Sequence, residues 1–386
     1  NTIQDQPQDE FERSGEPLPS HWISAWRSAR ALVEYHQFNE RLTKTDKQRL
    51  DVAGKKLLAL IPELPEKDKT RLWLLVDLLL DIYFHFSSNP IYAPVLGDLY
   101  TVRAELAFHQ RNNYATHENS PATIWNTAVS NAAQYKRRAG DEAGAKKVVE
   151  LARTHPHAAT KYDILSQTPI IYHPGLTAKP FWPASSWELA RRLEDAFAEH
   201  TLRSEIDREL DYIIANQGLE RLRSPVLPLD PGKPDAEKHW GGAWSEAVLY
   251  TGSRWKRQLC AAMPTITELL RGSQSAFNEI CSGPSRGNLC GPVAISILRL
   301  APGATILAHN GVTNRRLILH FALRGSEGVT IAVGGERREF GGDGHALVFD
   351  DSFEHSVHHQ GREDRYILFA QLKHPDVSEE TYQDLR

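Results

Sequence analysis

The 386-residue sequence predicts an α+β protein, in which an all-helical N-terminal domain is followed by a β-rich barrel or jelly roll. In the first half, apolar residues recur at helical spacing in successive segments joined by short polar links. Near residue 168 the chain becomes extended and proline-rich. After residue 240, short apolar runs alternate with glycine turns, which is typical of antiparallel barrels.

The first part of the chain predicts helices and no strands. Residues 1–18 are polar and contain proline, so we expect a flexible tail before a helical domain over 19–165. The expected helices are Ser20–Tyr35, Asp46–Leu60, Glu66–Phe86, Val95–Arg111, Ser120–Arg138 and Asp141–Thr154. This domain is either a platform that presents the substrate or a helical layer that buries one face of the catalytic part.

The second domain is expected over 166–386. Ser185 and Glu188 have the spacing of a capping box, which predicts one amphipathic helix to Asn216, closed by Gly218. A short helix is expected over Met263–Leu270. The expected strands are Ala247–Tyr250, Val293–Leu300, Leu317–Leu323, Thr330–Val333, Arg337–Phe340, Ala346–Phe349 and Tyr366–Leu372.

Composition excludes several classes of function. The net charge is −4 and no block of Lys and Arg occurs, so nothing indicates nucleic-acid binding. The most apolar segment, Leu72–Phe86, is shorter than the roughly 20 residues of a membrane span and contains Asp77 and Asp81. We therefore expect a core helix there and no membrane span.

The cysteine pattern favours a reducing compartment. The sequence has three cysteines, Cys260, Cys281 and Cys290, whereas a secreted framework uses a denser, even set. Cys281 and Cys290 are able to pair, but we expect three free thiols and a cytoplasmic protein. No signal peptide is recognised at Asn1, and a targeting segment trimmed from the N-terminus stays an open alternative.

Two histidines at strand ends indicate a metal site. His309 follows an apolar run and precedes an Asn-Gly turn, and His355 lies 46 positions later, after an Asp-Asp-Ser turn. Neutral imidazole is a common ligand of iron, zinc, copper and nickel. A jelly roll brings two such strand ends together at the mouth of its barrel, so we interpret the pair as metal ligands.

Near this pair the sequence has a residue suited to bind an anion, but it lacks a carboxylate as third metal ligand at the usual position. Many iron oxygenases use a carboxylate two residues after the first histidine, but that position is Gly311, so water or another residue must fill it. Arg365, ten residues after His355, is suited to hold a carboxylate of a dicarboxylate co-substrate. His320 is placed to donate to the same molecule. The alternative for Arg365 is a surface ion pair.

Residues 170–376 resemble the aspartyl/asparaginyl β-hydroxylase family. Three stretches contain the resemblance: Pro174-Gly175-Leu176 with Pro180-Phe181-Trp182; Pro302-Gly303 with His309-x-Gly311-x-Thr313-Asn314-x-Arg316-Leu317-x-x-His320; and Phe349-Asp350-Asp351-Ser352-Phe353-Glu354-His355. The last two are specific. The resemblance implies a double-stranded β-helix that binds Fe(II) and 2-oxoglutarate through two histidines and no carboxylate. It also implies His309 and His355 as iron ligands, and His320 and Arg365 as 2-oxoglutarate contacts.

The sequence departs from the family at three positions. A substrate-side arginine is replaced by Ile318, and a serine that helps to hold 2-oxoglutarate is replaced by Leu298. A family disulfide at the position of Cys260 would need its partner at Thr267. Loss of a fixed positive charge favours a less acidic substrate. Arg315 and Arg316 remain candidate anchors for a substrate carboxylate.

These observations predict a non-haem Fe(II)/2-oxoglutarate-dependent dioxygenase that uses O2 to oxidise an unactivated C–H, at the β-carbon if it follows the family. The departures favour a free amino acid or a small amino-acid-derived metabolite in a biosynthetic pathway, with hydroxylation, desaturation or ring closure as outcomes. One alternative is a peptidyl aspartyl/asparaginyl β-hydroxylase. The other is a non-catalytic, cupin-like binding module.

Overall fold

The computed structural model of the protein describes residues 19–37, 43–64, 68–84, 86, 90–107, 121–154, 162–216, 220–221, 244–281, 290 and 293–378. The chain divides into two compact units, Asn1–Ala159 and Thr160–Arg386. The sequence places this boundary after residue 165. The predicted tail, residues 1–18, and the predicted helix-closing Gly218 lie outside the described residues.

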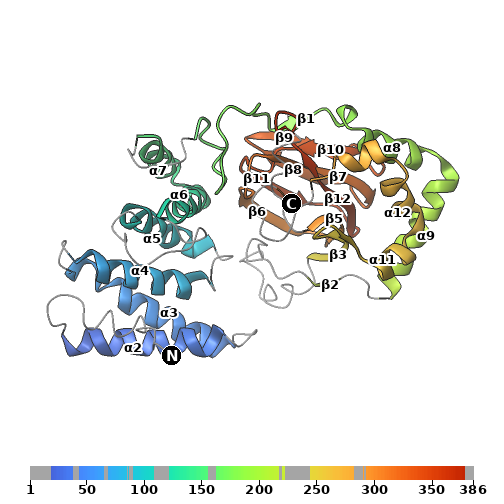
Figure 1. The fold of residues 1–386 in the computed structure, drawn as a ribbon. Coiled ribbons are helices and arrows are strands. Elements are labelled where there is room, and N and C mark those ends of the chain that lie inside the picture. Colours follow the sequence, from blue (N-terminus) through green and yellow to red (C-terminus); the bar gives the residue numbers. More distant parts are fainter. Residues whose placement is uncertain are drawn as a thin grey trace, which may run out of the picture. The chain divides into compact units, whose positions relative to one another are not determined.

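The first unit is helical in its described residues, as predicted. Its α-helices are α2 (Ser20–Gln37), α3 (Lys44–Leu58), α4 (Lys69–Phe84), α5 (Ala93–Leu106), α6 (Pro121–Arg138) and α7 (Glu142–Thr154). Helices that follow one another in the chain pack side by side, as Figure 1 shows in blue to green. Thr43 starts α3 with a capping box, because its side chain and that of Asp46 each accept the other residue's backbone N–H.

Helix α4 forms the centre of this unit. It is apolar on nearly every side, and Trp73, Leu75, Leu79 and Ile82 are each at most 2% exposed. A helix that is hydrophobic all round is buried. None of the described helices is both long enough and apolar enough to cross a membrane.

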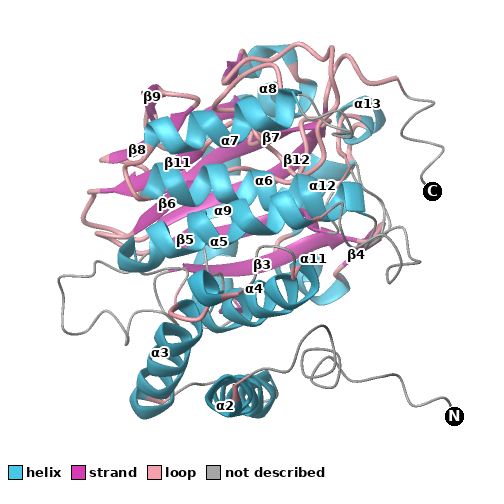
Figure 2. Cartoon of the chain, turned by 90° about the vertical axis from the view of Figure 1, so that its left-hand side faces the viewer, coloured by secondary structure: helices cyan, strands magenta, loops and turns pink. Residues whose placement is uncertain are grey.

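The second unit contains two antiparallel sheets (Figure 2). The larger has the order β1-β10-β7-β12-β5-β3-β2, with β4 paired to β3. Its strands are β1 (Phe181–Trp182), β2 (Glu220–Arg221), β3 (Trp244–Thr251), β4 (Arg254–Trp255), β5 (Val293–Leu300), β7 (Arg316–Arg324), β10 (Ala346–Phe349) and β12 (Arg365–Lys373). The smaller has the order β6-β11-β8-β9, from β6 (Thr305–His309), β8 (Val329–Val333), β9 (Glu336–Glu339) and β11 (His355–His359).

The connection of these sheets is that of a double-stranded β-helix. From β5 to β12 the chain alternates between the sheets, with β5, β7, β10 and β12 in the larger and β6, β8, β9 and β11 in the smaller. This winding confirms the predicted fold class. Two strands of the smaller sheet are not among the expected strands: β6, which the sequence analysis treats only as the apolar run before His309, and β11, because His-Ser-Val-His-His has little apolar content.

The larger sheet has two different faces. On β7, Leu317, Leu319 and Phe321 pack outward against the helices α8 (Glu188–Ala198), α9 (His200–Ala215) and α12 (Pro264–Arg271), seen beside the barrel in Figure 1. Ile318 and Ala322 point to the other side, into an apolar cluster between the two sheets. Because side chains alternate along a strand, every second residue of β7 therefore faces the barrel interior.

The single helix predicted from Ser185 to Asn216 is wrong. The helix is interrupted at Glu199, whose backbone is extended. The carboxylate of Glu199 accepts the N–H groups of Thr201 and Leu202 and so caps a second helix, α9. The predicted Ser185 capping box is absent too. Instead, the distant Glu279 accepts the N–H groups that start α8, a long-range contact that local spacing does not reveal.

The prediction of three free thiols is also wrong. Cys281 and Cys290 form a disulfide, with their Cα atoms 5.4 Å apart, and Cys260 is the free cysteine. Sequence alone does not fix the connectivity of cysteines, because pairing depends on where the backbone places them. The three reduced thiols that favoured a cytoplasmic location are therefore not present, and the compartment stays a prediction.

The disulfide gives a direct thiol count. Protein denatured without reductant should react with about one equivalent of a thiol reagent, because only Cys260 is free. After reduction the same sample should give all three equivalents of the sequence. Three equivalents before reduction, from protein purified without reductant, would contradict the disulfide, and Cys260→Ser provides the control that should give none.

Candidate functional site

The two predicted metal-ligating histidines lie opposite each other on neighbouring strands. His309 ends β6, His355 begins β11, and the two residues are direct partners in the antiparallel ladder. Their ring centroids are 4.0 Å apart. Residues 46 positions apart in sequence therefore become cross-strand neighbours in the smaller sheet.

Backbone carbonyls fix the tautomer of both rings. Nδ1 of His309 donates to the carbonyl of Leu307 at 2.8 Å, and Nδ1 of His355 donates to the carbonyl of Phe353 at 2.9 Å. A carbonyl only accepts, so each ring has its proton on Nδ1 and its lone pair on Nε2. Burial also lowers the pKa of His355, which favours the neutral imidazole that binds a metal. This is the arrangement in which a histidine serves as a metal ligand.

Gly311 is explained by what lies beside it. The carboxylate of Asp351 occupies the space that a side chain at position 311 would need: an added Cβ would be 2.3 Å from Oδ2. The backbone N–H of Gly311 donates to the carbonyl of Asp351 at 2.6 Å. Any side chain two residues after His309 would therefore have to displace the Asp351 carboxylate. Among the described residues, no group of three or more His, Cys, Asp and Glu side chains is arranged to hold a metal.

Asp351 is paired with one of the predicted substrate anchors. Arg316 is 8% exposed, and its Nη2 donates to Oδ2 of Asp351 at 3.1 Å. Nε of Arg316 and Oδ1 of Asp351 are buried without a hydrogen-bond partner among the described residues. The sequence contains Asp351 within a recognised motif but gives no sign of this contact, which joins residues 35 positions apart.

The predicted anion anchor is buried inside the barrel. Arg365 is 3% exposed, and its Nε and Nη2 find no hydrogen-bond partner in the described part of the chain. Its guanidinium lies 4.3 Å from the centroid of the Phe340 ring, which the sequence analysis does not single out. Burial lowers the pKa of Arg365 to about 9, so the group remains charged at neutral pH. The surface ion pair considered as the alternative is absent from the described contacts of Arg365.

His320 belongs to the same interior. It pairs with Phe369 on β12 and with Leu347 on β10, and its Nδ1 is buried with no partner among the described residues. Burial, followed by the charge of Arg365, lowers the pKa of His320 well below its ordinary value. His320 is therefore a neutral, partly unsatisfied imidazole beside a buried cation.

The remaining predicted substrate residues are less closely connected to the histidine pair. Ile318 is 2% exposed and lies in the apolar cluster between the sheets. Arg315 is half-buried; its charge, after burial, lowers the pKa of His173, and its carbonyl accepts the N–H of His374. The structure thus brings His309, His355, His320 and Arg365 into one barrel and leaves Arg315 on the side of His173.

A short segment that the sequence analysis did not single out ties the two histidine-bearing loops together. Asn310 Nδ2 donates to the carbonyls of Ser166, at 3.2 Å, and Ser352, at 2.8 Å. The same carbonyl of Ser166 accepts the N–H of Glu354 at 2.7 Å. Gln167 donates to Asp350, whose pKa burial raises to about 8. We call residues 166–168 the strap.

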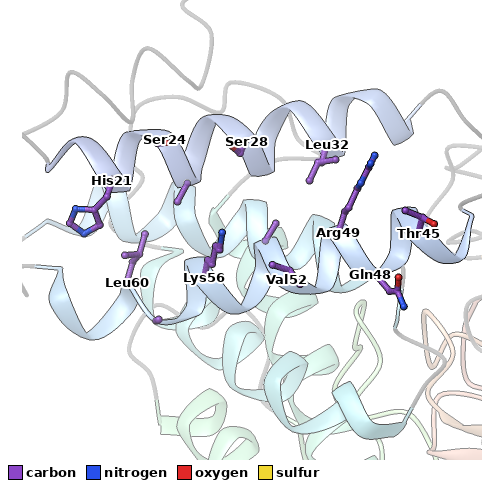
Figure 3. Close-up of a pocket in the computed structure, with 13 residues that line it drawn as sticks. His21, Ser24, Ser28, Leu32, Thr45, Gln48, Arg49, Val52, Lys56 and Leu60 are labelled. Atoms are coloured by element: carbon purple, nitrogen blue, oxygen red, sulfur yellow. The ribbon is translucent and has the colours of Figure 1, made fainter.

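A separate groove lies in the helical unit, between α2 and α3 (Figure 3). Its volume is about 720 Å³. The titratable residues that line it are His21, Arg49 and Lys56, and its described lining includes no acidic side chain. The groove contains none of the predicted site residues, and it offers basic and small side chains to a partner.

Comparison with known proteins identifies what the chain is similar to. Residues 204–375 match the sequence profile of aspartyl/asparaginyl beta-hydroxylase. Aspartate beta-hydroxylase domain-containing protein 1 of Mus musculus is 32% identical over 136 residues, 34% of this chain and 35% of that protein. Aspartyl/asparaginyl beta-hydroxylase of Mus musculus is 28% identical over 211 residues, 53% of this chain and 24% of that protein. The chain therefore spans about a third or less of the length of these curated relatives.

Among solved structures, a prolyl hydroxylase from Trichoplax adhaerens, in complex with a peptide fragment of the hypoxia inducible factor oxygen degradation domain, covers 51% of this chain. The match covers 92% of that chain, with 8% identity and a TM-score of 0.32. The double-stranded β-helix follows from the order of the strands in the two sheets.

The Gly311–Asp351 contact predicts a steric cost at this position. Gly311→Ala places a methyl group against the Asp351 carboxylate, so the free energy of unfolding should fall by about 1–3 kcal/mol. Gly311→Asp should cost more, since it adds charge repulsion. Urea denaturation measures both. Gly341→Ala is the control, because its Cβ would be no closer than 3.3 Å to the His345 ring. Equal stability of the Gly311 and Gly341 variants would contradict this account.

Proposed function

We propose that the barrel of this chain is the active site of a non-haem Fe(II)/2-oxoglutarate-dependent oxygenase. The premise is that the chain belongs, through residues 204–375, to the aspartyl/asparaginyl β-hydroxylase family. The strongest support is that one barrel contains both a histidine pair suited to bind a metal and a buried arginine. A histidine pair with both Nδ1 atoms tied to carbonyls lies across β6 and β11, and an arginine without an acidic partner among the described residues is buried in the same barrel.

The residues present fit Fe(II). Nε2 of His309 and Nε2 of His355 would hold the metal, and Gly311 leaves the neighbouring position without a protein carboxylate. Imidazole nitrogen is a suitable ligand for iron. When bound, Fe(II) with O2 and 2-oxoglutarate supplies the oxidation: one oxygen atom goes into succinate, formed with release of CO2, and the other goes into a C–H bond of the substrate.

The protein's own part is to bind and orient. Arg365 would pair its two unsatisfied nitrogens with the distal carboxylate of 2-oxoglutarate, which accounts for a buried cation that has no acidic partner among the described residues. The ring of Phe340 would keep the guanidinium in place. His320 would donate from Nδ1 to the same molecule. The apolar cluster between the sheets would exclude water from the reacting carbon.

We propose the β-carbon of an amino acid as the position oxidised, in a free amino acid or small derivative. Ile318 supports this choice, because the residue is buried and offers no fixed charge to an acidic side chain. Arg316 has its charge matched by Asp351, so it adds little attraction for an acidic side chain of the substrate.

A peptide substrate is the second candidate, and a different observation favours it. The basic groove between α2 and α3 offers a site where an acidic segment of a polypeptide would bind. The names of the matched relatives also refer to aspartyl or asparaginyl hydroxylation. The helical unit would then act as the platform that holds the peptide.

The role of Arg365 gives a quantitative prediction. Arg365→Ala should raise the KM for 2-oxoglutarate by more than tenfold, because hydrogen bonds to a charged group contribute about 1.5–3 kcal/mol each. Arg365→Lys should recover part of this, since the charge returns without the planar fork. Arg324→Ala is the control: Arg324 pairs with Asp207 and Asp211 on the outside. An unchanged KM in Arg365→Ala would remove it from this role.

The substrate class is decided by a succinate-release assay. Fe(II), 2-oxoglutarate and O2 would be supplied with a panel of free amino acids in one arm and Asp- or Asn-containing peptides in the other. We expect stimulated succinate release in the free amino-acid arm, with a mass increase of one oxygen atom in the product, whereas stimulation in the peptide arm alone would favour the second candidate. His309→Ala is the blank, because it removes one of the two ligands. Succinate release equal to that of the His309→Ala blank in both arms would contradict the enzymatic proposal and favour a binding module.

A further inference from the structure

A hydroxyl on β5 has no partner although it is completely buried. Ser296 is 0% exposed, and its Oγ makes no hydrogen bond within the described part of the chain. Leaving a hydroxyl unsatisfied away from water typically costs about 1–3 kcal/mol. Such groups are uncommon in folded proteins, and each one needs a reason.

The cross-strand register places this hydroxyl on the inner face of the larger sheet. Ser296 pairs with Phe369 on β12, and Phe369 pairs with His320 on β7. Paired residues of antiparallel strands point to the same face. The neighbours of Ser296 along β5, Ile295 and Ile297, belong to the outer cluster that packs against the helices. Ser296 therefore faces the barrel interior.

Three unsatisfied polar groups share that interior face of the larger sheet. Across the sheet, Ser296 and His320 flank Phe369, and along β12 the buried guanidinium of Arg365 lies on the same side as Phe369. The His320 and Phe369 ring centroids are 6.0 Å apart, so the phenyl ring forms a surface between the two polar groups. A single small anion over this ring would meet a donor on each flank and a cation beyond.

Resting on the proposed function, we propose that Ser296 is a further co-substrate-binding residue, whose Oγ–H donates a hydrogen bond to a carboxylate oxygen of 2-oxoglutarate lying over Phe369. A carboxylate oxygen accepts more than one hydrogen bond, and Arg365 and His320 use only part of that accepting capacity. The Ser296 hydroxyl would donate to the part that remains. Ser296 is a binding residue and takes no part in oxygen activation.

This proposal predicts opposite effects on stability and on binding. Ser296→Ala removes an unsatisfied hydroxyl, so the ligand-free protein should melt at the same temperature or higher. The variant should bind 2-oxoglutarate about tenfold more weakly, because it lacks one hydrogen bond to a charged ligand. A serine that served the fold alone would give the reverse: a lower melting temperature and unchanged binding.

The experiment is a titration of the full chain, loaded with Fe(II) under anaerobic conditions so that no turnover occurs. The Kd for 2-oxoglutarate is measured by calorimetry, and the melting temperature is measured with and without ligand. Ser296→Cys, which keeps the shape and a weak donor, should fall between the wild type and Ser296→Ala. Ser245→Ala is the matched control, since Ser245 is a buried serine on the adjacent β3 paired with Arg299 rather than with the interior residues.

Each outcome decides something. A Kd in Ser296→Ala within twofold of the wild type, or failure of that variant to fold, would overturn the role of Ser296 and leave the proposed function intact. Equal weakening in Ser245→Ala would also overturn it, because the effect would then belong to the strand. Absence of 2-oxoglutarate binding in the wild-type protein would overturn the proposed function and this inference together.

Discussion

The pairing of β6 with β11 is the constraint on which the candidate site depends. One cross-strand pair, His309 with His355, brings two residues 46 positions apart into ring contact. A slip by one residue would turn the second histidine to the other face. The regular ladder between β11 and β8 opposes this slip, because Val357 pairs with Ile331 and both are buried in the cluster between the sheets, whereas a β-bulge separates the histidine pair from the Val357–Ile306 pair. The apolar core therefore fixes the geometry of the polar site.

In the larger sheet, apolar packing likewise fixes the orientation of His320 and Arg365, the proposed co-substrate contacts. Phe321 and Tyr366 pack outward under the helices, and this holds the neighbouring positions His320 and Arg365 toward the interior. The cost is several polar atoms removed from water with no partner in the described chain. Such atoms are tolerable when a ligand completes their hydrogen bonds, and each is then part of a binding pocket and not of the fold.

Sequence reasoning succeeds here where the signal is local. The helices of the first unit follow from apolar spacing, and most strands of the barrel follow from alternation. His309, His355 and Arg365 can be singled out as candidates because their residue types and strand-end positions are themselves the signal, and their roles stay predictions. What could not be predicted depends on long-range contacts. Glu279 caps a helix 90 positions away, Asp351 occupies the space beside Gly311, and the cysteine pairing depends on the fold.

The strap shows that residues before the start of the family profile help to hold the candidate site. The family profile starts at residue 204, yet the carbonyl of Ser166 holds Asn310 and Glu354 beside both histidines, and β1 completes the sheet edge against β10. Helix α8 also lies before 204 and covers the outer face of β7. A chain cut back to residues 204–375 would separate the histidine loops from this brace. The unit that can be grafted intact is therefore longer than residues 204–375, the part that the family profile matches.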